Sequence, residues 1–290
     1  MKVNKIIQED CLKAMKMKEM KTGSIDCIIT DPPYQYLKHI LDVPFDEKVF
    51  FKECFRVLKN NRCLVFFGRG ESFYRWNTIC NQIGFKFKEE LIWFKKYSSS
   101  PFTPIGRVHE TLVVLEKGKR VLNKVYIDYI DYRESLEEYK ALINVFKRSI
   151  NFIKKANTYE EFKELKEDSF KGERTIKHCI TGNKGKSLSR KRSTVKSIIK
   201  GRKLSSILSI VREHYRFIHP TQKPVKLLKQ LIQLTSEKHD IILDPFAGSG
   251  SLGVSCNSLK RKFILIERNK DFFKSMKERL IENKIVFEES

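Results

Sequence analysis

The chain has 290 residues, which is enough for about two domains and a full-sized hydrophobic core. Its formal net charge of +23 and its pI near 9.7 indicate a polyanionic partner, although a general richness in lysine, isoleucine and asparagine accounts for part of that charge. Because the sequence contains neither a run of 18 apolar residues nor a signal peptide, we expect a cytosolic protein without a membrane segment.

The cysteines bear on redox and metal chemistry. There are seven of them, scattered along the chain without C-x-x-C pairing. An odd, scattered set argues against a disulfide framework and against a zinc site. We therefore expect no metal, and thiols that are reduced and mostly buried.

The first elements in chain order are short. Weak alternation at 3–7 predicts a strand, and 12–20, with lysines on its exposed positions, predicts a helix. The apolar run 27–30 is typical of a buried strand. The stretch from Tyr34 to Pro44 is either an ordinary connection or a loop over a site, and the ordinary connection is the simpler interpretation.

The motif Asp31-Pro32-Pro33-Tyr34 closes the run 27–30, and its residue types suit chemistry at the amine of a nucleobase. The prolines fix φ and remove donors, which holds the motif rigid at the carboxyl end of a strand, where open α/β sheets bind ligands. If Asp31 and the Pro32 carbonyl each accept one N–H, the nitrogen can pyramidalise and present its lone pair. Stacking on Tyr34, worth about 1–3 kcal/mol, offsets part of the cost of flipping the base. A plain Asp-Pro-Pro turn with a packed Tyr fits these four residues equally well.

The next segments alternate between the two kinds of element. Apolar spacing predicts helices at 50–58 and 73–83, and strands at 63–67, 85–93 and 111–115, with Lys59-Asn60-Asn61 and Gly84 as helix stops and Pro101, Pro104 and Gly106 marking a loop. This alternation implies a parallel sheet with right-handed crossovers.

The composition changes after Lys117-Gly118. Residues 126–157 and 159–167 are charged and helix-prone, whereas 171–216 is basic and punctuated by glycines, with acids only at Glu173 and Glu213. Such an insert fits a nucleic-acid surface; the alternative, a disordered solvated tail, suits an internal position less well. The candidate phosphate contacts are Lys184, Lys186, Arg190, Lys191, Arg192, Lys196, Arg202 and Lys203.

A glycine-rich loop marks the C-terminal part. The segment His219 to Pro224 precedes an amphipathic helix at 225–234, and a strand at 241–243 runs into Asp244. Three glycines then follow with G-x-G-x-x-G spacing, and Glu267 ends the next strand, 263–266, where an acid is placed to bind a ribose diol. The glycines are Gly248, Gly250 and Gly253.

A nicotinamide enzyme is the rival interpretation of this loop. Only one helix, at about 271–283, and a short tail follow Glu267, so the remaining strands of the sheet must come from the N-terminal half. This order fits a dinucleotide fold poorly. Both halves of the chain then share one sheet, which brings Asp31 next to the glycine loop.

Taken together, these residues resemble the N6-adenine and N4-cytosine DNA methyltransferases of the permuted (beta) group, in which the catalytic motif precedes the target-recognition region and the S-adenosylmethionine motif follows it. Two segments match the motifs of the family, 31–34 the catalytic motif and 244–250 the cofactor loop. A third segment, 219–224, resembles the one that helps enclose the methionine moiety. Weaker matches are Asp10, the helix end 56–59 and His109-Glu110. Ser251 stands where the family commonly has Thr, and Asn60-Asn61 replaces a Pro-Gly type turn.

The resemblance implies an α/β fold, a doubly wound, mainly parallel Rossmann-like methyltransferase sheet with an inserted target-recognition region. Residues 1–118 would form the catalytic half, 119–201 the basic insert and 202–290 the cofactor-binding half. The implied activity is methyl transfer from S-adenosylmethionine to adenine N6 of a base flipped out of double-stranded DNA. The alternatives are an N4-cytosine enzyme, since Asp at the first motif position is only a tendency of adenine enzymes, an RNA substrate, and a catalytically silent DNA-binding subunit.

The resemblance also implies roles for individual residues and leaves two partners open, a cognate restriction endonuclease and a second copy of the chain. The catalytic residues would be Asp31, Pro32, Pro33 and Tyr34, and the cofactor-binding residues Asp10, Cys11, His219, Thr221, Lys223, Asp244, Phe246, Gly248, Ser249, Gly250 and Glu267.

Overall fold

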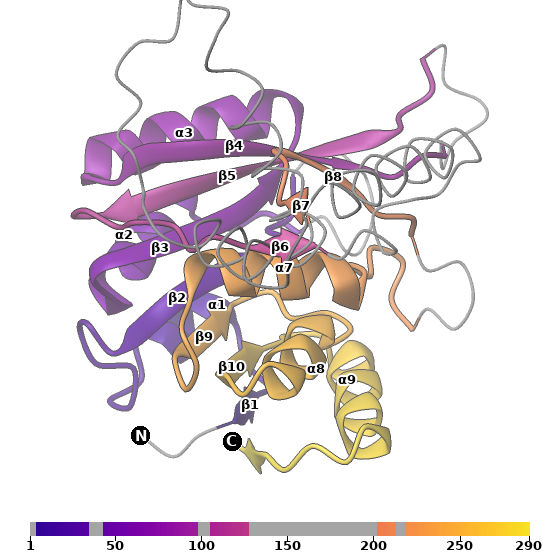
Figure 1. Ribbon diagram of the computed structural model, residues 1–290. Helices are drawn as coiled ribbons and strands as arrows, with labels where there is room; N and C mark the ends of the chain where they lie inside the picture. The colour runs from indigo at the N-terminus through magenta and orange to yellow at the C-terminus, as the bar shows by residue number, and fades with distance from the viewer. Residues whose placement is uncertain (1–3, 35–42, 98–104, 128–201, 213–217) are drawn as a thin grey trace, which may run out of the picture. The chain divides into compact units, whose positions relative to one another are not determined.

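The computed structural model describes residues 4–34, 43–97, 105–127, 202–212 and 218–290 (Figure 1). The chain divides into two compact units, 1–123 with 205–290, and 124–204. In the described part of the second unit, β6 (Tyr126–Ile127) pairs antiparallel with β7 (Arg202–Lys203). The domain limits that we expect from the sequence remain predictions.

One mixed sheet forms the centre of the first unit. Its described strands are, in spatial order, β11 (Glu288–Glu289), β1 (Lys5–Ile7), β10 (Lys262–Ile266), β9 (Ile241–Asp244), β2 (Ile25–Thr30), β3 (Leu58–Gly68), β5 (His109–Lys117), β4 (Lys86–Phe94) and β8 (Ile207–Ser209). All neighbouring pairs are parallel except those that β5 makes with β3 and β4. The mainly parallel α/β sheet is therefore confirmed.

The parallel pairing that the alternation of strands and helices implies does not extend to β5. A crossover through a helix gives β3 and β4 the same direction, and β5 lies between them and runs the opposite way. The segment 95–108 that joins β4 to β5 contains Pro101, Pro104 and Gly106. These residues disfavour the helix that a parallel return would need.

Helices cover both faces of the sheet (Figure 1). One face is covered by α1 (Cys11–Met15), α2 (Glu47–Val57) and α3 (Gly70–Ile83), and the other by α7 (Val225–Thr235), α8 (Ser251–Ser258) and α9 (Lys270–Glu282). The sheet is thus doubly wound, as expected.

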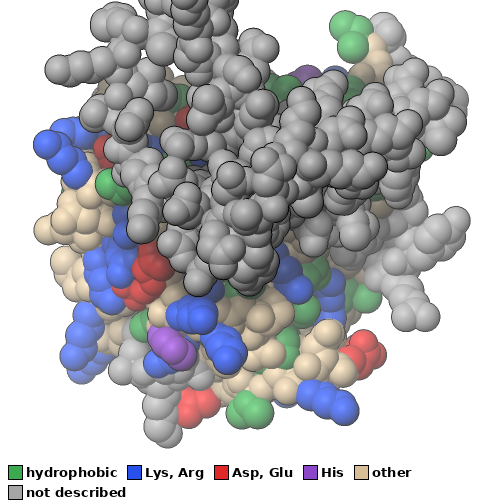
Figure 2. All heavy atoms as spheres, in the orientation of Figure 1, with side chains coloured by type: hydrophobic (Ala, Val, Ile, Leu, Met, Phe, Trp, Pro, Cys, Tyr) green, Lys and Arg blue, Asp and Glu red, His purple; other side chains and the backbone are tan. Residues whose placement is uncertain are grey.

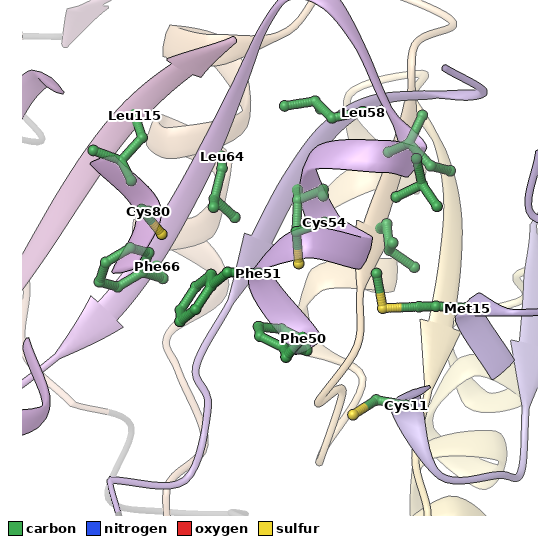
Figure 3. Packing of buried hydrophobic residues seen from close by; sticks show 14 of the residues in the cluster. Cys11, Met15, Phe50, Phe51, Cys54, Leu58, Leu64, Phe66, Cys80 and Leu115 are labelled. Carbon is green, nitrogen blue, oxygen red and sulfur yellow. The ribbon is translucent and has the colours of Figure 1, made fainter. Parts of the chain in front are cut away.

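Alternation along the strands sends side chains to both faces. Leu64 and Phe66 of β3 pack with Phe51 of α2 and Cys80 of α3 in one apolar cluster (Figure 3). Cys27 of β2 points to the other face, where its Sγ lies 3.3 Å from Oγ1 of Thr235 in α7. Because successive side chains of a strand alternate, one short strand can anchor both helical layers.

The first helix is shorter than its sequence pattern predicts. It ends at Met15, although lysine spacing predicts a helix to Met20. The guanidinium of Arg56 in α2 donates to the carbonyls of Met15 (2.6 Å) and Met20 (2.9 Å). A charged donor from another helix thus satisfies carbonyls that further helical turns would have used.

The six cysteines in the described part of the chain are all buried. None of the helices in the described ranges is long and apolar enough to cross a membrane.

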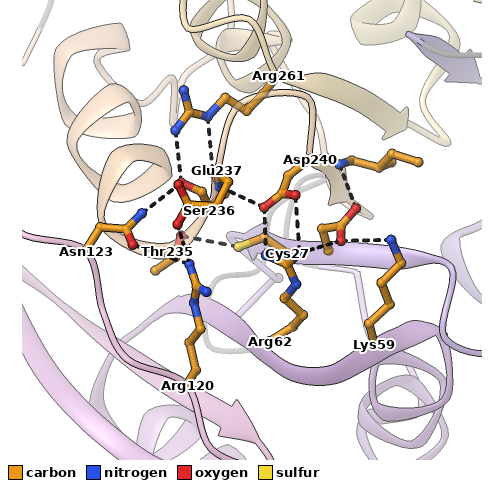
Figure 4. A network of polar contacts seen from close by, with 12 residues as sticks. Cys27, Lys59, Arg62, Arg120, Asn123, Thr235, Ser236, Glu237, Asp240 and Arg261 are labelled. Atoms are coloured by element: carbon orange, nitrogen blue, oxygen red, sulfur yellow. Dashed lines mark hydrogen bonds and ion pairs between the residues drawn. The ribbon is translucent and has the colours of Figure 1, made fainter.

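A cluster of charged side chains ties three strands together at the amino-terminal edge of the sheet (Figure 4). Asp26 of β2 accepts from Lys59 Nζ (2.8 Å) and from the backbone N–H of Ile241 (3.1 Å), and it forms an ion pair with Arg62 of β3 (3.1 Å). Arg62 also pairs with Asp240, just before β9, at 2.8 Å. These contacts join β3, β2 and β9 across the middle of the sheet.

We predict that Asp26→Ala lowers the free energy of unfolding by about 3 kcal/mol, because it leaves two cations and a buried N–H without this acceptor. The matched control is Lys59→Ala, whose side chain is 41 % exposed against 5 % for Asp26. It should cost below about 1 kcal/mol. Urea unfolding followed by fluorescence measures both, and equal losses would contradict this role of Asp26.

Candidate active site

Four acidic side chains gather at the carboxyl-terminal edge of four neighbouring strands. Asp10 follows β1, Glu267 follows β10, Asp244 ends β9 and Asp31 follows β2. All four line one cavity of about 720 Å³. Open α/β sheets bind ligands at this edge, and the volume is within the usual range for small-molecule sites.

Asp31 is held from two sides. Its Oδ1 accepts a hydrogen bond of 2.7 Å from the Tyr34 hydroxyl, and its Oδ2 forms an ion pair with the Lys223 ammonium. The Tyr34 ring lies 6.0 Å from the Trp76 ring, tilted by 52°. The Asp-Pro-Pro-Tyr motif is therefore fixed by the core beneath it and by Lys223, far along the chain.

Lys223 connects Asp31 to a second carboxylate. Its Nζ lies 3.3 Å from Oε2 of Glu110 in β5, and Glu110 Oε1 lies 3.2 Å from Lys95 Nζ. The ammonium of Lys223 also lies 4.8 Å from the centroid of the Phe67 ring. A chain of alternating charges thus forms part of the cavity wall.

Sequence patterns did not single out most of this chain of charges. The resemblance gave Glu110 only a weak match, and Lys95 belongs to no motif. Lys223 was expected to bind the cofactor, whereas its described contacts are to the two carboxylates. A pair of like charges with a lysine between them arises only when β5 folds beside β3, so no local spacing could reveal it.

The glycine loop lies between β9 and α8 and is held by its neighbours. The N–H of Gly248, which has φ of 49°, donates to Glu267 Oε2 at 2.9 Å. A Cβ on Gly250 would lie 2.6 Å from Cγ of Met276, and one on Gly253 2.9 Å from Cδ1 of Leu265. The first glycine therefore provides a left-handed turn, and the other two allow close packing of α8.

Ionising all the carboxylates at the carboxyl-terminal edge of the sheet at the same time costs free energy. Burial, together with the charges of Asp31 and Glu267, raises the pKa of Asp244 to about 7, although a hydrogen bond from the Phe246 N–H opposes the rise. Burial also raises the pKa of Glu267. Such crowding favours a ligand that brings positive charge or hydrogen-bond donors into the cavity.

His219 closes the cavity over the glycine loop as a neutral ring. Its Nδ1 is 3.3 Å from the backbone N of Thr221, which donates to it, and its ring meets the Phe272 ring edge-on at 4.2 Å. A Cβ on Gly248 would lie 3.3 Å from the imidazole. Burial, helped by the Lys223 charge, lowers the pKa of His219 to about 4.

The structure brings most of the expected cofactor residues together. All of them except Gly250 line the cavity, as do the four residues of the catalytic motif. Six of the eight basic residues expected to bind nucleic acid, from Lys184 to Lys196, lie outside the described residues. The other two, Arg202 and Lys203, belong to β7 in the second unit. Roles for individual residues remain predictions.

The depressed pKa of His219 predicts a loss of stability in acid. The imidazole has a pKa near 6.5 in the unfolded chain and about 4 in the folded protein, so protonation favours unfolding. The contribution of His219 to the free energy of unfolding is therefore complete above pH 6.5 and is lost as the pH falls towards about 4. Between pH 7 and pH 5 the wild type should lose about 2 kcal/mol more than His219→Gln. Urea unfolding at both pH values measures this, and an identical loss in both proteins would contradict the prediction.

Comparisons with known proteins agree with this geometry. The family model described as DNA methylase matches residues 25–278. The chain is 26 % identical over 285 residues to the type II methyltransferase M.HpaI of Haemophilus parainfluenzae, covering 93 % of this chain and 73 % of that one. It is 25 % identical over 282 residues to the DNA adenine methyltransferase YhdJ of Escherichia coli K12, covering 93 % and 80 %.

Two solved structures share the fold. M1.HpyAVI in complex with SAM superposes with a TM-score of 0.57 at 20 % identity, covering 95 % of this chain and 99 % of that one. The cytosine-N4-specific PvuII DNA methyltransferase superposes with a TM-score of 0.59 at 14 % identity, covering 98 % and 88 %. Because the family model spans most of the sequence, the chain belongs to the DNA methylase family that comprises the N6-adenine and N4-cytosine enzymes.

Proposed function

We propose that the chain transfers a methyl group from S-adenosylmethionine to N6 of an adenine flipped out of double-stranded DNA. The observation that carries this proposal is that Asp31 and the glycine loop line the same cavity. At Asp31 the cavity thus offers a hydrogen-bond acceptor for an amine. At the glycine loop it offers carboxylates and backbone groups for a nucleoside-like cofactor.

The residues beside the glycine loop fit the cofactor. Glu267 stands at the end of β10, where a carboxylate can accept hydrogen bonds from ribose hydroxyls, and Asp10 follows the neighbouring strand β1, in the loop that we expect to approach the adenine of the cofactor. At Gly248, in its left-handed turn, an added Cβ would lie 3.3 Å from the His219 ring, so a side chain there would crowd the ring. When bound, S-adenosylmethionine supplies a methyl group on a sulfonium centre, whose positive charge suits this crowded acidic edge.

The chain's own residues would position the base. Asp31 and the Pro32 carbonyl accept the two amine N–H groups, so the nitrogen lone pair turns towards the cofactor side of the cavity. The Tyr34 ring offers a face for stacking, worth about 1–3 kcal/mol. These residues would thereby align the amine nitrogen for in-line transfer of the methyl group that the bound cofactor would supply.

Adenine is favoured over cytosine by sequence and not by fold. Asp at the first position of the motif is the tendency of the adenine enzymes, and the relative YhdJ, which is matched over 93 % of this chain, is named as an adenine methyltransferase. The cytosine-N4-specific PvuII structure nevertheless shares the fold at low identity, so the fold itself does not choose the base. Cytosine N4 is therefore the second candidate.

The order of the motifs supports membership of the permuted group. The catalytic motif at 31–34 precedes the basic segment, and the glycine loop at 244–250 follows it. We assign the basic segment to DNA binding, because it concentrates positive charge, whereas Figure 2 shows Asp and Glu side chains among the Lys and Arg on the described part of one face. A restriction endonuclease partner and a homodimer remain predictions.

Separate roles for Asp31 and Glu267 predict opposite defects. Asp31→Asn should lower methyl transfer about 100-fold or more while cofactor affinity stays within about threefold, since Asp31 contacts the amine. Glu267→Gln should weaken cofactor binding by about 1–3 kcal/mol. Calorimetric titration with S-adenosylmethionine and a tritium-transfer assay measure both effects. Loss of cofactor binding in a folded Asp31→Asn protein would contradict the assignment.

The product distinguishes the candidate functions. We expect N6-methyladenine, confined to one short motif, in genomic DNA from a host that lacks DNA methylation and expresses this chain. Mass spectrometry of digested nucleosides identifies the base, and long-read sequencing locates the motif; Asp31→Asn expressed in the same host is the control. N4-methylcytosine would change the base assignment. Unmethylated DNA from a folded, cofactor-binding protein would overturn the proposal and favour a silent subunit or an RNA substrate.

A further inference from the structure

We propose that Lys223 is a positioning residue that keeps Asp31 ionised and correctly oriented, and that it does so by serving as a shared cation for Asp31 and Glu110. The inference rests on the proposed function, because Asp31 is there the acceptor of the amine. It gives Lys223 a role towards the base and not towards the cofactor.

The geometry places one ammonium between two carboxylates. Nζ of Lys223 contacts Asp31 Oδ2 and lies 3.3 Å from Glu110 Oε2. The side chain of Lys223 is only 10 % exposed, and those of Asp31 and Glu110 are 20 % and 15 % exposed. The ring centroids of Phe67 and Trp93 lie 4.8 and 5.9 Å from the same Nζ, so two aromatic rings also border the ammonium. Most of the surface of these three side chains is therefore shielded from solvent.

Two carboxylates that are this close and this sheltered cannot both stay ionised without a cation. Burial raises the pKa of Asp31, and Lys223 is the main group that opposes this rise. The two carboxylates in turn raise the pKa of Lys223, so the ammonium keeps its proton despite its burial. Removing Lys223 would leave an excess negative charge in the wall of the cavity.

The loss of Lys223 would affect Asp31 more than Glu110. Glu110 keeps a second cation, because Lys95 lies 3.2 Å from its Oε1 and both lysines lower its pKa. Among the described residues, Lys223 is the only Lys or Arg that forms an ion pair with Asp31. The other groups that face Asp31 are the Tyr34 hydroxyl and the negative charges of Asp244 and Glu110; His219, near Lys223, is neutral. Without Lys223, Asp31 would take up a proton and lose an acceptor position.

Three variants test the proposal through the pH profile of single-turnover methyl transfer at saturating S-adenosylmethionine. Lys223→Met should slow transfer roughly tenfold or more at pH 7, because a protonated Asp31 can no longer accept the amine N–H, and the rate should recover as a higher pH ionises Asp31. Lys223→Met combined with Glu110→Gln removes the excess charge. The acid limb of the pH profile, that is, the fall of the rate at low pH, should then return towards its position in the wild type. Lys223→Arg keeps the cation and should leave the acid limb in place.

A second readout needs neither DNA nor cofactor. The carboxyl carbon of Asp31, labelled with ¹³C and assigned by its absence in Asp31→Asn, should titrate at higher pH in Lys223→Met than in the wild type. Near-ultraviolet circular dichroism checks folding, and if Lys223→Met does not fold, the Arg variant and the double variant provide the test. A folded Lys223→Met protein with an unshifted acid limb and an unshifted carbon titration would overturn the inference. A wild type that binds the cofactor but methylates no DNA would instead overturn the proposed function, while the carbon titration would still decide the role of Lys223.

Discussion

The parallel pairing of β2 with β9 is the constraint on which the site depends. Cys27 and Ile28 lie opposite Ile242 and Leu243, so a strand from the first thirty residues is joined to one more than two hundred residues later. This register puts Asp31 and Asp244 at the same edge of the sheet. A shift by one residue would turn every side chain of β2 to the other face and would move the Asp-Pro-Pro-Tyr motif along the edge.

The two ends of this strand pair handle charge in opposite ways. At the amino-terminal edge, Asp26 and Asp240 share the cation Arg62, and Asp26 also pairs with Lys59. At the carboxyl-terminal edge, burial and the neighbouring charges of Asp31 and Glu267 raise the pKa of Asp244 to about 7. The ion pairs at the first edge stabilise the fold, whereas the perturbed carboxylates at the second edge are typical of a binding cavity.

Much of this arrangement can be predicted from the sequence, and what cannot is tertiary in origin. Apolar periodicity predicts the other strands of the parallel core and the helices α2, α3, α7 and α9 to within a few residues, since one buried face imposes the pattern. The strand β3 is the exception, because it begins at Leu58 and includes the residues 59–61 that the sequence indicates as a helix stop. The strands β8 and β11, of three and two residues, are too short to carry a period. The direction of β5 was also missed, because the order of strands in space decides it.

The residues of the candidate site also divide into those that local sequence predicts and those that only the tertiary fold brings together. Asp31, Gly248 and Glu267 stand in motifs whose spacing reflects local geometry, a rigid strand end and a tight turn, and all three line the cavity. Glu110 and Lys95 owe their place to the pairing of β4 with β5, in which Phe94 lies opposite His109. Sequence separation alone gives no reason to connect these two residues with Asp31.

The partners of Asp31 also bear on how the proposed reaction disposes of its proton. An ionised carboxylate has about four acceptor positions, and the Tyr34 hydroxyl and the Lys223 ammonium use one each, so an amine N–H can bind without displacing either. The same ammonium makes Asp31 a weaker base, because it stabilises the charged form. Asp31 is therefore better suited to orienting the amine before the methyl group moves than to removing its proton first. The nitrogen becomes strongly acidic only once it has bonded to the methyl carbon, and at that point even a weak carboxylate base can accept the proton.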